Sequence, residues 1–213
     1  MKNALTKLSI LPLLLLGLTA GCSSLDYDDP DMVETLTIDF GSTDLQQLAG
    51  SMSESLIASP GLAYLDHSGK GEDKRIIVFT GEVDNRTTEH IDTQGITDSI
   101  RVSLLKSGKF RIVTSDAGQA EVGDQVSFQQ GSGRVDLDMA KAFGRQLGAD
   151  VVLYGTLRSI DKREGGSLET LGTRKRDLYY QFVLECVNIE TGEVIWMDEE
   201  DIRKRKSTGL LGR

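Results

Sequence analysis

An alternation of side chains near the end of the chain constrains the fold more than any other feature of the sequence. Every second residue from 180 to 186 is apolar: Tyr180, Phe182, Leu184 and Cys186. The side chains that alternate with them include Tyr179, Gln181 and Glu185. A period of two residues is that of a β-strand, whose side chains point to alternate faces. We therefore predict a strand over residues 177–189 with one face in the core.

The residues around this strand predict a mixed sheet. Glu190-Thr191-Gly192 indicates a tight turn to a second strand over 193–202. Apolar stripes about one helical turn apart predict helices over 43–58, 92–107 and 136–147. Shorter apolar runs predict strands over 36–40, 75–83, 110–115 and 150–160. Since strands alternate with helices before an antiparallel pair ends the chain, we expect an α/β (α+β) domain with flanking helices.

The N-terminus has the features of a bacterial export signal. Two lysines precede an apolar run over residues 8–18, which has the length of a signal-peptide core and is too short to span a bilayer. Thr19-Ala20-Gly21 then leads to Cys22, which resembles the lipobox of bacterial lipoproteins. We predict that residues 1–21 are a cleaved signal peptide and that Cys22 is lipidated. An ordinary signal peptide with a chance cysteine is the alternative.

The rest of the chain divides into three parts. Residues 22–35 predict an acidic, self-repelling linker that spans at most about 50 Å when extended. Residues 36–202 form the predicted globular domain. Residues 203–213 carry five basic side chains and no acidic ones, and we interpret them as a frayed basic tail. A contact with an acidic partner surface is the second interpretation of this tail.

Charge and cysteine content exclude several classes of protein. Removal of residues 1–21, which hold two lysines and no acids, changes the formal net charge from −9 to −11. This charge argues against a nucleic-acid partner, because such binding neutralises phosphates with Lys and Arg. Cys186 is the only cysteine besides Cys22, so an acylated Cys22 leaves no intramolecular disulfide. We expect Cys186 to be buried in the core.

The sequence contains no clear catalytic, metal or cofactor motif. Its two histidines, His67 and His90, lack the spacing of a metal site. Asp66-His67-Ser68 places triad-type residues next to one another, whereas triad members come from separate segments. Gly131-Ser132-Gly133 does not follow a strand, as a dinucleotide-binding motif would. We therefore predict that the protein is not an enzyme, uses no cofactor and acts by binding a partner.

Several segments, in this order, resemble the LpoB family of penicillin-binding protein activators. They cover roughly residues 76–197, and they are specific as a set. They are Ile76-Ile77-Val78-Phe79, Asn85-Arg86-Thr87, Leu105-Lys106-Ser107-Gly108-Lys109-Phe110, residues 147–154 and Thr191-Gly192-Glu193-Val194-Ile195-Trp196.

The resemblance implies both a fold and a function. The fold is that of the N-terminal domain of TolB. The protein would be an outer-membrane lipoprotein, anchored by lipid and facing the periplasm, and Ser23 after the cysteine is consistent with that address. Its domain would bind the regulatory domain of a bifunctional class A penicillin-binding protein and stimulate it. The alternative is an envelope assembly or secretion lipoprotein related to the curli-secretion channel component.

Two surface patches are the predicted partner-binding sites. The first is the turn Asn85, Arg86 and Thr87, because polar loop residues after a buried strand often bind partners. The second is Tyr179, Gln181 and Glu185, on the exposed side of the last two strands. Both have a purely structural alternative: Asn85 caps its own turn, and Tyr179 packs under a helix.

Overall fold

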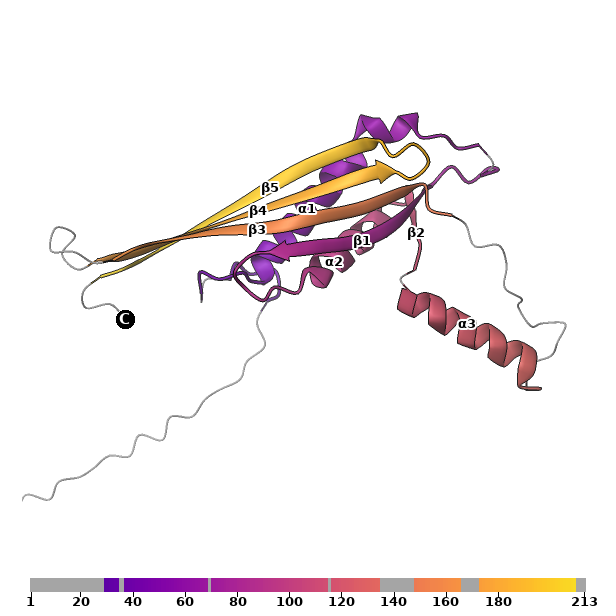
Figure 1. Ribbon diagram of the computed structural model, residues 1–213, viewed down its shortest axis with the longest axis horizontal. Helices are drawn as coiled ribbons and strands as arrows, with labels where there is room; N and C mark the ends of the chain where they lie inside the picture. Colours follow the sequence, from indigo (N-terminus) through magenta and orange to yellow (C-terminus); the bar gives the residue numbers. More distant parts are fainter. Residues whose placement is uncertain are drawn as a thin grey trace, which may run out of the picture. The chain divides into compact units, whose positions relative to one another are not determined.

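The computed structural model describes residues 29–34, 37–68, 70–114, 116–134, 148–165 and 173–209. Contacts separate residues 1–30 from residues 31–213, and the second unit contains every helix and strand described below. Cys22 and the predicted signal peptide lie outside the described residues. Figure 1 shows the elements in chain order, which are α1 (Ser42–Ala58), η1 (Pro60–Tyr64), β1 (Ile76–Arg86), α2 (Thr93–Lys106), β2 (Phe110–Ile112), α3 (Asp116–Gly131), β3 (Val151–Glu164), β4 (Arg174–Asn188) and β5 (Val194–Thr208).

The five strands form one mixed sheet in the order β2-β1-β3-β4-β5. The two pairs that β1 forms, with β2 and with β3, are parallel. The pairs β3–β4 and β4–β5 are antiparallel, with Leu157 opposite Phe182 and Tyr180 opposite Ile202. This arrangement confirms the predicted mixed sheet with flanking helices.

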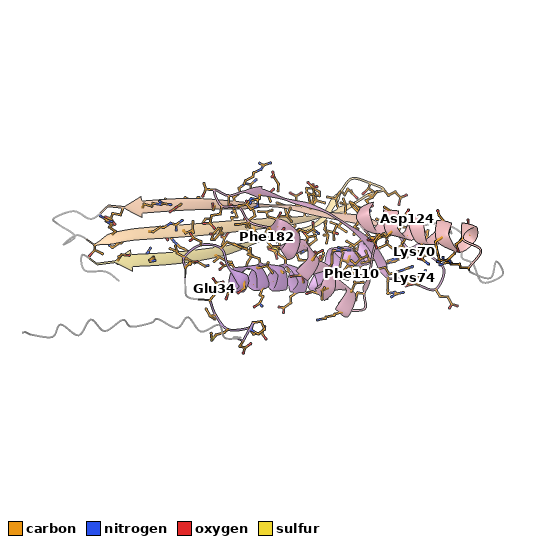
Figure 2. The ribbon with its side chains drawn as sticks, turned by 90° about the horizontal axis from the view of Figure 1, so that it is seen from below. Glu34, Lys70, Lys74, Phe110, Asp124 and Phe182 are labelled. Atoms are coloured by element: carbon orange, nitrogen blue, oxygen red, sulfur yellow. The ribbon has the colours of Figure 1, made fainter. Side chains whose placement is uncertain are left out.

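Helices α1 and α2 cover one face of the sheet, and in Figure 1 both lie behind the strands. Three side chains of each helix are buried at one-turn spacing, as the sequence predicted: Leu48, Met52 and Leu56 of α1, and Ile96, Ile100 and Leu104 of α2. Phe182 and Phe110, labelled in Figure 2, are buried in the same core. Local signals set the ends of α2, because the Asp92 side chain accepts a hydrogen bond from the backbone N–H of Gln94 and Gly108 has a positive φ of 72°.

Strands β3, β4 and β5 continue past the helices in Figure 1 and are longer than predicted. The predicted end of the last strand at residue 202 is wrong, since residues 203–208 belong to β5. These basic residues pair with carboxylates of neighbouring elements, so they extend the sheet instead of fraying. Arg203 bonds to Asp177 of β4 at 2.7 Å, and Lys204 forms an ion pair with the buried carboxylate of Asp44 on α1.

Two other predicted elements differ from the structure. Thr37–Phe40, the described part of the predicted strand over 36–40, is not a strand. Phe40 instead places its ring edge-on to Tyr180, with a centroid distance of 5.4 Å, so the segment enters the core as a loop. The predicted helix over 136–147 lies outside the described residues. Helix α3 was not predicted, because its apolar residues form no clear stripe at helical spacing. In the structure, Val122 and Phe128 of this helix are exposed.

No described helix is both long enough and apolar enough to cross a bilayer.

Replacement of Leu157 by alanine should test the core between the sheet and the helices. Leu157 is fully buried in β3, so we expect the free energy of unfolding to fall by about 2–5 kcal/mol. Ile160→Ala is the matched control on the same strand, because Ile160 is 54% exposed on the other face and should cost less than about 1 kcal/mol. Urea unfolding of both variants measures the difference, and equal losses would contradict the assignment of the two faces.

Candidate docking surface

The face of the sheet opposite α1 and α2 carries a second set of side chains, which neither of these helices covers. Residues paired across neighbouring strands share a face, so the strand registers define its members. We call this surface the open face. Its central residues are Asp84 and Arg86 of β1, Val152, Tyr154, Thr156, Arg158 and Ile160 of β3, Tyr179, Gln181, Val183, Glu185 and Val187 of β4, and Met197, Glu199, Asp201 and Arg203 of β5.

All three predicted residues of β4 lie on the open face. Tyr179, Gln181 and Glu185 are partly exposed, whereas the residues alternating with them are buried, which confirms the predicted alternation. Because Tyr179 alternates with the side chains of β4 that are buried in the core, it does not pack under α1 or α2.

Hydrogen bonds across the strands hold several of these side chains in place. Gln181 Nε2 donates to Glu199 Oε2 at 3.2 Å, and the Tyr154 hydroxyl donates to Glu185 Oε2 at 3.1 Å. A hydrogen bond to Glu185 raises the pKa of Tyr154, and a hydrogen bond to Asp201 raises the pKa of Tyr179. Both phenols therefore stay protonated at neutral pH.

The predicted turn 85–87 divides into a structural and an exposed part. The Asn85 side chain donates from Nδ2 to the carbonyls of Glu89 and Ile91, and its Oδ1 accepts from the backbone N–H of Thr87. The Thr87 hydroxyl also bonds within this loop. Arg86 instead points to the open face, where it pairs with Asp84 at 2.6 Å and remains largely exposed. Of the three predicted residues, the structure leaves only Arg86 available to a partner on this face.

The strand register places the two predicted patches on one surface. Arg86 of β1 lies opposite Arg158 of β3, Arg158 lies opposite Gln181 of β4, and Gln181 lies opposite Asp201 of β5. Neighbouring strands are about 4.8 Å apart, so roughly 10 Å separates the backbones at Arg86 and Gln181. The sequence analysis missed Arg158, and only the register between β3 and β4 would have identified it.

The open face has an apolar end and a charged end. Tyr154 and Met197 are 40% and 57% exposed, and both lie near the start of β3 and β5. Toward the other end, a shallow hollow of about 220 Å³ is lined by Ile160, Lys162, Asp177, Tyr179 and Arg203. A surface with exposed aromatic and apolar groups beside charges is typical of protein–protein contact regions.

We call the side of the sheet that faces α1 and α2 the covered side. A cluster of charges there links β3, β4 and the segment before α1. The Arg176 guanidinium bonds to Asp161 and to Asp39, at 3.0 Å and 2.7 Å. Hydrogen bonds from Arg163 and Arg176 lower the pKa of Asp161 to about 2, so its carboxyl group is ionised at neutral pH and is not suited to proton transfer.

Glu89 connects three segments of the chain close to that cluster. Its Oε2 accepts hydrogen bonds from the backbone N–H of Phe40 at 3.0 Å and from the hydroxyl of buried Tyr180 at 2.8 Å. Burial is the main cause that raises the pKa of Tyr180, and the carboxylate of Glu89 adds to it. Glu89 therefore joins the loop after β1 to β4 and to the segment before α1.

Among the other residues considered for chemistry, Asp66 and Ser68 bond to each other within their loop. Ser68 donates its hydroxyl to Asp66 at 2.6 Å, which lowers the pKa of that carboxyl, and His67 Nδ1 has no hydrogen-bond partner. Within the described parts of the chain, no group of three or more His, Cys, Asp or Glu side chains could hold a metal ion. Cys186 is buried and free, and burial raises the pKa of its thiol to about 12.

Comparisons with known proteins identify one family. The family described as "Peptidoglycan-synthase activator LpoB" matches residues 44–202, which is most of the chain. No match was found among curated proteins.

Solved structures include similar folds at low sequence identity. The LpoB C-terminal domain from Salmonella enterica is 16% identical, with a TM-score of 0.43, and the match covers 76% of this chain and 99% of that one. The corresponding domain from Escherichia coli is 18% identical, with a TM-score of 0.40 and coverage of 74% and 98%. Lipoprotein GNA1162 from Neisseria meningitidis is 15% identical, with a TM-score of 0.35 and coverage of 62% and 84%.

Alanine variants of neighbouring residues should separate the structural part of the turn from its exposed part. Asn85→Ala removes bonds to Glu89 and Ile91, so we expect it to lower the free energy of unfolding by about 1–3 kcal/mol. Arg86→Ala removes an exposed ion pair and should change it by less than about 0.5 kcal/mol. Chemical denaturation measures both. An Arg86→Ala loss as large as that of Asn85→Ala would show that Arg86 also supports the fold.

Proposed function

Because the chain belongs to the LpoB family of peptidoglycan-synthase activators, we propose that it is an outer-membrane lipoprotein that binds and stimulates a bifunctional class A penicillin-binding protein. The match over residues 44–202 carries this proposal, since it extends from α1 to β5 and includes the open face. The synthase performs the chemistry, and this protein supplies a binding surface for the regulatory domain of the synthase.

The open face is the surface that we assign to this contact. It combines Arg86 and Arg158 with the aromatic ring of Tyr179, and Arg and Tyr are enriched among residues that dominate binding energy. These side chains project from paired strands, so little backbone conformational entropy is lost when a partner binds. The central row also includes Gln181 and Asp201, which offer polar contacts beside the aromatic and basic groups.

An activity assay with a purified class A synthase tests the proposal. We expect addition of the protein to raise the rates of glycan polymerisation and of peptide cross-linking, and we expect the two proteins to co-purify. Failure to bind or to stimulate any class A synthase of the same cell would contradict it. Sedimentation of the detergent-solubilised protein as a ring of many subunits would instead favour the envelope assembly alternative.

Alanine variants on the open face should weaken this contact without unfolding the protein. We expect Arg86→Ala and Tyr179→Ala each to cost at least about 1 kcal/mol of synthase binding, with an unchanged melting temperature. Tyr64→Ala is the matched control, because Tyr64 lies in η1, is 88% exposed and is not part of the open face. Binding by surface-immobilised synthase and melting by circular dichroism separate the outcomes. A drop in melting temperature for both test variants would place the docking surface elsewhere.

The anchor is a separate part of the proposal and rests on the sequence alone. We expect Cys22→Ala to leave the signal peptide uncleaved or to release the protein from the membrane fraction, because acyl chains on Cys22 would supply the membrane attachment. Fractionation of cell envelopes and the mass of the mature chain measure this. A variant that is still processed and still found in the outer membrane would refute lipidation at Cys22.

A further inference from the structure

The charges of strand β5 change sign at one apolar residue. Four acidic residues, Asp198 to Asp201, precede Ile202, and four basic residues, Arg203 to Lys206, follow it. β5 is the edge strand of the sheet, and the outer side of its backbone is paired with no other strand in the described part of the chain. An exposed edge offers N–H and C=O groups to another strand.

We propose that two copies of this chain associate through an antiparallel pairing of their β5 strands, with a two-fold axis at Ile202. In this register, every charged residue from 198 to 206 lies opposite a residue of the other sign in the second copy. The four kinds of pair are Asp198 with Lys206, Glu199 with Arg205, Glu200 with Lys204, and Asp201 with Arg203. Opposite charges that face each other across neighbouring strands stabilise the pairing, and like charges destabilise it.

The charge pattern selects this register over the alternatives. An axis at residue 201 or 203 would form only two kinds of opposite-charge pair, and it would place Asp201 or Arg203 opposite its own copy. A parallel, in-register pairing would place each charge opposite itself and would be repulsive. A self-complementary surface is the requirement for a two-fold interface between identical chains. Strands without this order of charges would form fewer opposite-charge pairs, so the pattern also favours the protein's own copy over other partners.

The charges on the open face are accessible for this pairing. The side chains of Arg203 and Arg205 are 64% and 66% exposed, and both already contact Asp177. A guanidinium has five N–H donors, so each arginine can keep Asp177 and accept a second carboxylate. Glu199 and Asp201, which would meet these arginines, are exposed, and their carboxylates bond to the neutral side chains of Gln181 and Tyr179.

The covered side contributes less, because charges there already have partners within the chain. Lys204 already pairs with buried Asp44, and Glu200 accepts a hydrogen bond from Gln47. A hollow of about 460 Å³ borders Ile202 and Lys204 on this side of the edge. Helix η1 packs near the backbone of Ile195, outside residues 198–206. The pairing therefore needs only the segment from Asp198 to Lys206.

The two-fold axis would be perpendicular to the sheet. Paired residues then share a face, so the open faces of the two copies join into one surface and the helices of both copies lie on the other side. This association depends only on β5 and is independent of the proposed synthase.

Two charge-reversal variants of the full chain test the proposal. Glu199→Arg with Asp201→Arg makes the open side of this segment wholly basic, and Arg203→Glu with Arg205→Glu makes it wholly acidic. One chain carries an affinity tag and the other does not, and both are produced together and purified in a mild detergent. We expect wild type to retain untagged wild type. We expect the basic pair and the acidic pair each to lose at least about tenfold of that retention, and the mixture of basic with acidic chains to recover it.

The design separates a loss of pairing from a loss of folding, because a misfolded variant would not recover in the mixture. It also controls for shared detergent micelles, which would retain all four combinations equally. Retention of wild type should fall at 1 M salt, since exposed ion pairs are screened there. Equal retention of all combinations, or no retention of wild type by wild type, would overturn the proposal and leave the β5 charges as a device that keeps the edge unpaired.

Discussion

The apolar side chains that β4 sends toward α1 and α2 hold the domain together. Leu178, Tyr180, Phe182, Leu184 and Cys186 are all essentially inaccessible to water. Full burial of one large apolar side chain is worth about 1.5–3 kcal/mol, so this one strand contributes a large part of the stabilisation. Cys186 is a free thiol within the stripe, and the core therefore works without a disulfide there. Because α1 and α2 both lie on this side of the sheet, they leave the side chains of the other side available for contact.

A few partly buried polar groups determine which side chains remain free to bind. Glu89 joins Tyr180 to the backbone of Phe40, and Asn85 holds the loop that carries Glu89. Partly buried polar groups are costly to leave without hydrogen bonds, so the side chains of Asn85 and Glu89 stabilise the fold. Arg86 lies between them in the chain, but the alternation of β1 turns its side chain to the open face. Neighbours in sequence thus take different roles because a strand has two faces.

At the end of the sheet, the alternation of β5 side chains decides which charges lie on the covered side and which lie on the open face. Lys204, on the covered side, pairs with a carboxylate that is almost completely buried, and loss of either partner would leave an isolated charge in a poorly solvated site. Arg203, on the open side, pairs with Asp177 where water screens the interaction. The covered pair attaches β5 to α1, whereas the open pair leaves its arginine available for other contacts.

The sequence alone determined the features that depend on one segment at a time. The alternation of β4, the apolar stripes of α1 and α2 and the cap of α2 all follow from local periodicity and local hydrogen bonds. The family motifs likewise placed this chain in its family, since their order is a property of the sequence.

Only the tertiary structure decided the features that depend on two distant segments. Residues 203–208 are a strand because residues 174–179 pair with them, and Phe40 lies in a loop because Tyr180 and Glu89 fix its position. The row of Arg86, Arg158 and Gln181 exists because three strands adopt one register. Periodicity shows which side chains of a strand share a face, but it does not show which residue of another strand lies opposite. That choice rests on the energy of contacts between residues far apart in the chain.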